Sequence, residues 1–92
     1  MPGGMASGEG RIYIVHGHRV LSFSAKSAML VASCGGRGRS DAFFNRPSDL
    51  ETHRGELFVA DTHNDRVVVL SSSLTFLRRS RLLFELPYPC AY

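Results

Sequence analysis

Residues that could hold a metal ion are few in this sequence, and their spacing is poor for that purpose. Asp61, His63 and Asp65 alternate as they do at the start of a calcium loop. Such a loop needs Gly at its sixth position and Glu at its twelfth, where this chain has Arg66 and Ser72. The segment therefore predicts a turn and not a calcium site.

Two further groups could do chemistry but lack partners. His16 and His18 could place two imidazoles near one metal ion, yet no third ligand lies near them in the sequence. Cys34 has no basic partner beside it, so we expect a small buried or edge residue and not a nucleophile. No Gly-x-Ser-x-Gly motif is present. The sequence predicts no catalytic residue, no metal and no cofactor.

Arginine supplies nearly all of the positive charge. Of the 11 basic residues only Lys26 is a lysine, and the formal net charge is +3. Arginine favours planar, paired contacts with carboxylate or phosphate groups. A net charge this small is weaker than the basic stripe of a dedicated nucleic-acid binder. The charge pattern therefore favours an acidic partner without identifying it as a nucleic acid.

Composition fits one small domain. The chain has 92 residues, and 43% of them are hydrophobic, which is ordinary for a globular protein. Neither a signal peptide nor a membrane-spanning run is visible. The two cysteines, Cys34 and Cys90, are too few for a disulfide framework, so we expect a reducing, cytoplasmic compartment and no membrane partner.

The clearest pattern is an internal repeat. Residues 12–15 resemble residues 57–60 at a separation of 45, and residues 19–24 resemble 66–71 at a separation of 47. Residues 44–47 are echoed 40 residues later, at 84–87. Such periods are typical of β-propeller blades or helical solenoids. The repeated runs are short, β-branched and aromatic, which favours strands.

The repeat predicts an all-β fold of propeller blades. One unit reads as a four-stranded antiparallel meander, with strands over 48–52, 56–61, 66–71 and 75–80. The chain would hold about two blades in an incomplete ring. Its predicted parts are a disordered lead (1–10), a partial blade of three strands without its inner strand (11–36), a complete blade (37–83) and the start of the next blade (84–92).

Fewer than about three repeats seldom suffice for a stable fold. Two arrangements would complete the blades. Either the chain is a piece of a longer protein, or copies associate head to tail. The uneven repeat spacings favour the longer protein.

The unit from 37 to 83 resembles an NHL repeat. That family's pattern is a Gly-rich lead, then Phe-x-x-Pro, then Gly-x-hydrophobic-hydrophobic-Val-Ala-Asp-x-x-Asn-x-Arg-hydrophobic. Here the matching runs are Phe44 to Pro47 and Gly55 to Val67. The first copy departs from the pattern, because it has His16 in place of Asp61 and lacks the Asn. The resemblance implies a propeller of the kind that forms interaction domains in modular proteins.

The predicted meander brings the linker between blades and the turn after residue 61 to the same end of the sheet. The candidate binding residues there are Arg37, Arg39, Arg46, His63, Asn64 and Arg66. Arg81 and the acids Asp41, Asp61 and Asp65 share this end, which keeps the basic excess small.

The leading hypothesis is a scaffold that binds protein, or alternatively RNA, through this loop-rich face. The alternative is a fragment of a propeller enzyme, a lyase or hydrolase that could depend on a metal. Turn chemistry alone also accounts for Asp61, Asn64 and Arg66, with Arg66 bracing the turn or a neighbouring blade.

Overall fold

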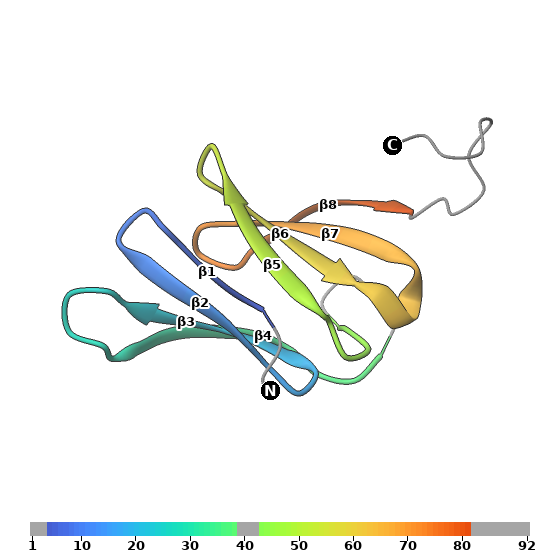
Figure 1. The fold of residues 1–92 in the computed structure, drawn as a ribbon, viewed down its shortest axis with the longest axis horizontal. Coiled ribbons are helices and arrows are strands. Elements are labelled where there is room, and N and C mark those ends of the chain that lie inside the picture. Colours follow the sequence, from blue (N-terminus) through green and yellow to red (C-terminus); the bar gives the residue numbers. More distant parts are fainter. Residues whose placement is uncertain (1–3, 39–42, 82–92) are drawn as a thin grey trace.

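The computed structural model describes residues 4–38 and 43–81, which form two four-stranded antiparallel sheets (Figure 1). The first sheet has the order β1 (Met5–Gly8), β2 (Arg11–His16), β3 (Arg19–Ser24), β4 (Leu30–Gly35). The second has the order β5 (Asp49–His53), β6 (Glu56–Asp61), β7 (Arg66–Ser71), β8 (Phe76–Arg81), with the short 3-10 helix η1 (Thr62–Asn64) between β6 and β7. The all-β prediction is confirmed, and each sheet is blade-like. The strands within these residues do not close a ring.

The second sheet follows its predicted strands closely. β6 and β7 begin and end at the predicted residues, and β5 and β8 each lie one residue later than predicted. The reason is the strict alternation in β6, where Leu57, Val59 and Asp61 are buried while the residues between them are half-buried. A period of two fixes which face of a strand points to the core, and so fixes the register.

The first sheet differs from the prediction at its inner strand. The sequence predicts a disordered lead over residues 1–10 and a blade of only three strands over 11–36, but Met5–Gly8 is strand β1 and pairs with β2 along its whole length. The prediction was wrong here because Met-Ala-Ser-Gly has little β-propensity. The strand is held by its pairing and by packing. The predicted blade start at 84–92 lies outside the described residues.

Matching two-residue turns close the inner hairpin of each sheet. Glu9 and Gly10 have φ of 55° and 72°, and Arg54 and Gly55 have φ of 51° and 78°. Positive φ at both central residues defines the type I′ turn, whose twist suits an antiparallel hairpin. The two turns are 45 residues apart, so the repeat includes the inner strands.

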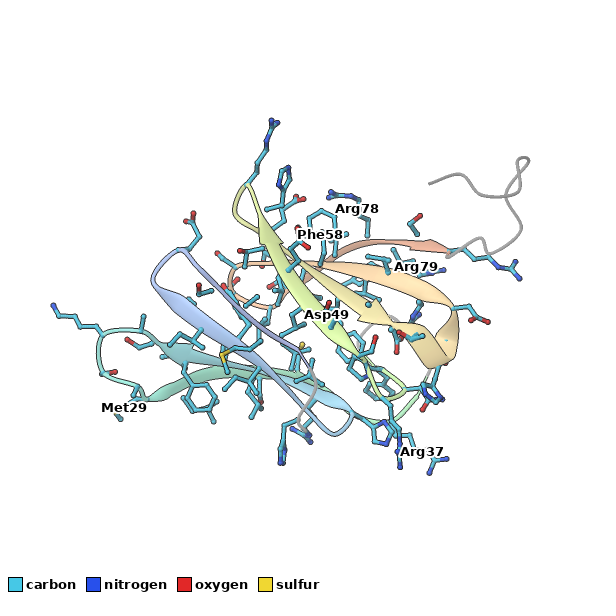
Figure 2. The ribbon with its side chains drawn as sticks, viewed as in Figure 1. Met29, Arg37, Asp49, Phe58, Arg78 and Arg79 are labelled. Carbon is cyan, nitrogen blue, oxygen red and sulfur yellow. The ribbon has the colours of Figure 1, made fainter. Side chains whose placement is uncertain are left out.

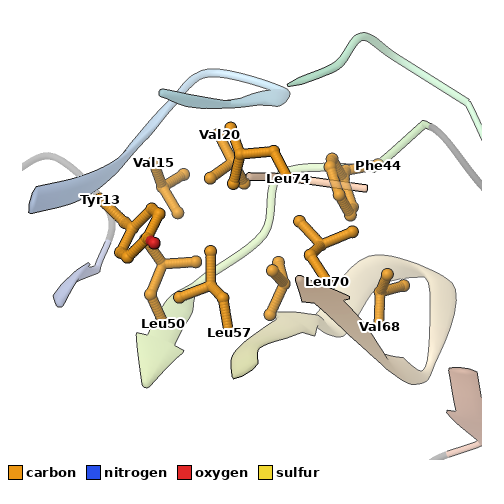
Figure 3. Packing of buried hydrophobic residues seen from close by; sticks show 10 residues of the cluster. Tyr13, Val15, Val20, Phe44, Leu50, Leu57, Val68, Leu70 and Leu74 are labelled. Carbon is orange, nitrogen blue, oxygen red and sulfur yellow. The ribbon is translucent and has the colours of Figure 1, made fainter. Parts of the chain in front are cut away.

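The hydrophobic core lies between the two sheets (Figure 3). The first sheet contributes Tyr13, Val15 and Val20, and the second covers them with Leu50, Leu57, Val59, Val68 and Leu70. Phe44 from the linker and Leu74 from the β7–β8 turn complete the cluster. Burying a side chain of this size contributes about 1.5–3 kcal/mol, so this packing dominates the stability of the pair.

Hydrogen bonds across the core fix how the sheets lie on each other. The Tyr13 hydroxyl donates to the carbonyl oxygen of Ser72 at 2.8 Å, and the Thr52 hydroxyl donates to that of Ser7 at 2.7 Å. Both bonds join residues on different sheets. The two sheets therefore form one packed unit.

The Arg54–Gly55 turn generates a prediction about backbone strain. A Cβ at Gly55 would meet no heavy atom within 4 Å, so a substitution there is opposed by the positive φ alone. Gly55→Val should lower the free energy of unfolding by about 1–3 kcal/mol, and Gly55→Asn by less, since Asn tolerates positive φ. Urea unfolding of both variants measures this. Equal losses for Val and Asn would contradict the strain argument.

Ser22 generates a second prediction, because its hydroxyl is fully buried without a hydrogen-bond partner among the described residues. The equivalent position in the second sheet is Val69, which is apolar. Ser22→Ala removes the unsatisfied group and should raise the free energy of unfolding by about 1 kcal/mol. Ser33→Ala, an exposed serine of the same sheet, is the control and should change it little. A loss of stability in Ser22→Ala would show that the hydroxyl is satisfied.

Candidate functional site

Three connecting segments meet at one end of the molecule, which we call the loop end. They are the β2–β3 turn at Gly17 and His18, the described parts of the linker between the sheets (36–38 and 43–48), and the β6–β7 turn with η1 (Figure 1). The His18 carbonyl oxygen accepts from the Gly36 amide at 2.9 Å, and its Nδ1 accepts from the Arg46 amide at 3.0 Å. These two bonds hold the linker against the β2–β3 turn, and the Asn64 side chain binds it to the β6–β7 turn by donating to the Gly38 carbonyl oxygen. The linker and the turn after residue 61 therefore share one end, as predicted.

The carboxylate of Asp61 organises this end. It is fully buried, and it accepts hydrogen bonds from the Asn45 amide at 2.8 Å, the Asn64 side chain at 2.9 Å and Arg66 Nε at 2.9 Å. A buried charge is tolerated only where it is paired and hydrogen-bonded. Asp61 meets both conditions and joins β6, β7 and the linker.

Arg66 and Asn64 extend the network to the linker backbone. Arg66 is only 7% exposed, forms an ion pair with Asp61, and donates from Nη2 to the Phe43 carbonyl oxygen at 2.6 Å. Asn64 donates to the Gly38 carbonyl oxygen at 2.8 Å. The Asp, Asn and Arg of the repeat motif thus bind the linker to the β6–β7 turn, and Arg66 braces the turn as the alternative structural interpretation expects.

The remaining predicted binding residues lie around this network. Arg37 and Arg46 are exposed on the linker, and His63 is exposed on η1. Figure 2 shows Arg37 at the margin of the molecule, away from the core. Arg39 lies outside the described residues. The structure therefore brings Asn64 and Arg66 together, and it spreads the other three over the surface of the same end.

A basic hollow opens beside the network, which we call the arginine hollow. Its volume is about 380 Å³, and its lining residues are Asn64, Asp65, Arg66, Arg79 and Arg81. Arg81 lies opposite Arg66 in the strand pairing, and Arg79 lies opposite Val68, so all three arginines share one face of the second sheet. Guanidinium groups gathered in this way suit a carboxylate or phosphate ligand.

Sequence reasoning did not select Arg79 as a binding residue. Residues 78–81 read Arg-Arg-Ser-Arg, a short basic run. The structure divides this run by the alternation of β8: Arg78 lies on the opposite face and pairs with Glu56, at 2.7 and 3.2 Å (Figure 2). The signal available in the sequence was the alternation of side chains between the two faces of a strand, which separates Arg78 from Arg79 and Arg81.

The other candidate groups are separated in the structure. Within residues 4–38 and 43–81, no cluster of three or more His, Cys, Asp or Glu could hold a metal ion. His18 Nδ1 is a hydrogen-bond acceptor, and His16 is exposed. Burial raises the pKa of the Cys34 thiol to about 11, so the thiol stays protonated at neutral pH.

Comparisons with known proteins add no relative. No family model matches the sequence, and no curated protein matches it. Among the described residues there is also no helix with the length and apolar character to span a membrane.

The buried carboxylate generates a prediction about stability. Asp61→Ala would remove the buried ion pair with Arg66 and the acceptor of the Asn45 amide, and it should lower the free energy of unfolding by about 3–5 kcal/mol. Glu51→Gln removes an exposed carboxylate from the same sheet and should change it by less than about 0.5 kcal/mol. Chemical unfolding of both variants tests this. A small loss in Asp61→Ala would mean that the network does not hold the loop end.

Proposed function

We propose that this chain is a binding module whose loop end recognises an acidic segment of a protein partner. The observation that carries the proposal is the arginine hollow, where Arg66, Arg79 and Arg81 line one concave surface. The assignment of the blades to the NHL-repeat type belongs to the same proposal, since that family's propellers serve as interaction domains.

The charge balance at the loop end supports an acidic ligand. Asp61 is buried and compensated by Arg66, so it contributes no negative charge to the surface. Among the described lining residues, Asp65 is then the acid that remains, beside Arg79 and Arg81.

The described parts of the linker are held in place, which favours recognition. Gly38, Asn45 and Arg46 are hydrogen-bonded to Asn64, Asp61 and His18. Groups that are already ordered lose less conformational entropy when a ligand binds. A site built on such a connection between packed sheets follows the usual division between scaffold and binding loops.

Single-stranded RNA is the second candidate, because an aromatic side chain lies exposed on the same linker. Phe43 is 44% exposed, although it is an apolar residue next to the fully buried Phe44. Proteins bind single strands by combining arginine contacts to phosphates with stacking of bases on aromatic rings. One exposed ring offers one stacking position, so this ligand ranks second.

Binding of two labelled probes tests the proposal. A fluorescent poly-glutamate peptide and a fluorescent poly-uridine RNA are titrated with the chain, and anisotropy is measured at rising salt concentration. Arg81→Ala should weaken binding of the preferred probe by about three- to tenfold, the loss expected for one charge-assisted contact. The affinity should also fall as salt rises.

Lys26→Ala is the matched control, since it removes the same charge from the exposed β3–β4 turn at the other end of the molecule. It should leave binding nearly unchanged. If it weakens binding as much as Arg81→Ala does, attraction is diffuse and the loop end is not the site. If Arg81→Ala weakens binding of the RNA probe and not of the peptide probe, RNA is the ligand and the second candidate replaces the first.

A further inference from the structure

The two sheets repeat each other position by position, and this defines two faces on each. In the first sheet the front face carries Tyr13, Val15 and Val20, which pack on the second sheet. Their equivalents in β6 and β7 are Phe58, Ala60 and Val67, the front face of the second sheet. The opposite, back face carries Ile12, Ile14, Leu21 and Phe23 in the first sheet, equivalent to Leu57, Val59, Val68 and Leu70 in the second.

The core is therefore one front face packed on one back face. In the described part of the chain, one further front face and one further back face have no sheet packed on them. Leu57, Val59 and Val68 on the covered back face are fully buried. Their equivalents Ile12, Ile14 and Leu21 are only partly buried. On the same face as Ile14 and Phe23, Met5 and Leu30 are 66% and 56% exposed.

The front face of the second sheet is likewise less buried than the equivalent face of the first sheet. Phe58, Ala60 and Val67 are partly buried, whereas their equivalents Tyr13, Val15 and Val20 are buried. These three residues form the floor of a hollow of about 410 Å³ with Asp49, Glu51 and His53 along its rim. Figure 2 shows Phe58 on the side of the second sheet that faces away from the first.

We propose that the back face of the first sheet binds the front face of the second sheet of another copy, so that copies of this chain associate head to tail. The internal packing is the template, because the same residue positions meet in both contacts. A contact between different faces can propagate or close into a ring.

The inner strands set a limit on how closely the copies approach. Within the chain, a Cβ on Gly4 would lie 2.5 Å from the Leu50 amide nitrogen, so β1 and β5 meet through small residues. Pairing with β2 and β6 makes Gly4 equivalent to Asp49 and Ala6 equivalent to Glu51. In the proposed contact between copies, the larger side chains of Asp49 and Glu51 keep β5 further from the facing sheet. The middle strands of the two sheets therefore form most of that contact.

Complementary variants test the head-to-tail contact. Ile14→Lys blocks the back face, and Phe58→Lys blocks the front face. Light scattering on the wild-type chain should show a concentration-dependent mass at multiples of 10.1 kDa. Each variant alone should be monomeric, with association at least about a hundredfold weaker, since an unpaired charge would be buried. An equimolar mixture should form a one-to-one dimer, because each variant keeps the face that the other needs.

Controls separate the contact from misfolding. Leu30→Lys and Val67→Lys block the same two faces at other positions and should behave as the first pair does. Ala25→Lys lies on an exposed turn outside both faces and should associate as the wild type does. Glu51→Ala, which copies Ala6, should strengthen association several-fold. A wild-type chain that stays monomeric at about 1 mM, or single variants that still dimerise, would overturn the proposal.

Discussion

The buried carboxylate of Asp61 is the constraint on which the loop end depends. A charge removed from water must be compensated, and three donors from three segments provide the compensation: the Asn45 amide, the Asn64 side chain and Arg66. Because each donor belongs to a different part of the chain, satisfying the charge also fixes the linker against the β6–β7 turn. The position of Phe44 in the core follows, since it lies next to Asn45 in that fixed linker.

The equivalent positions of the first sheet have no such charge pair. His16 stands where the second sheet has Asp61, and Arg19 where it has Arg66, and both are exposed. The β2–β3 turn is instead tied to the linker through His18, by its carbonyl oxygen and its Nδ1. The two copies thus tie equivalent turns to the linker through residues at different positions, which explains why the first copy lacks the motif but keeps the strands.

Strand positions in the second sheet could be predicted from the sequence because Leu57, Val59 and Asp61 alternate with less buried residues. β1 could not be predicted from its own residues, since its order comes from pairing with β2 and close approach to β5. The signal that was available is the match of Gly10 with Gly55, both second in a two-residue turn. The sequence also predicted that the linker and the β6–β7 turn lie at one end. It did not predict the arginine hollow, because only pairing across strands shows that Arg66, Arg79 and Arg81 share a face.

The same alternation that places the arginines also divides the functions of the second sheet. On its back face, Leu57, Val59 and Val68 cover the first sheet, and Arg79 and Arg81 continue that face toward the loop end. On its front face, the apolar floor with Phe58 lies beside the Arg78–Glu56 pair. An acidic ligand at the hollow and a second copy on the front face would therefore occupy opposite sides of one sheet. Because the described lining residues of the two surfaces do not overlap, the two proposed partners would not compete for the same side chains.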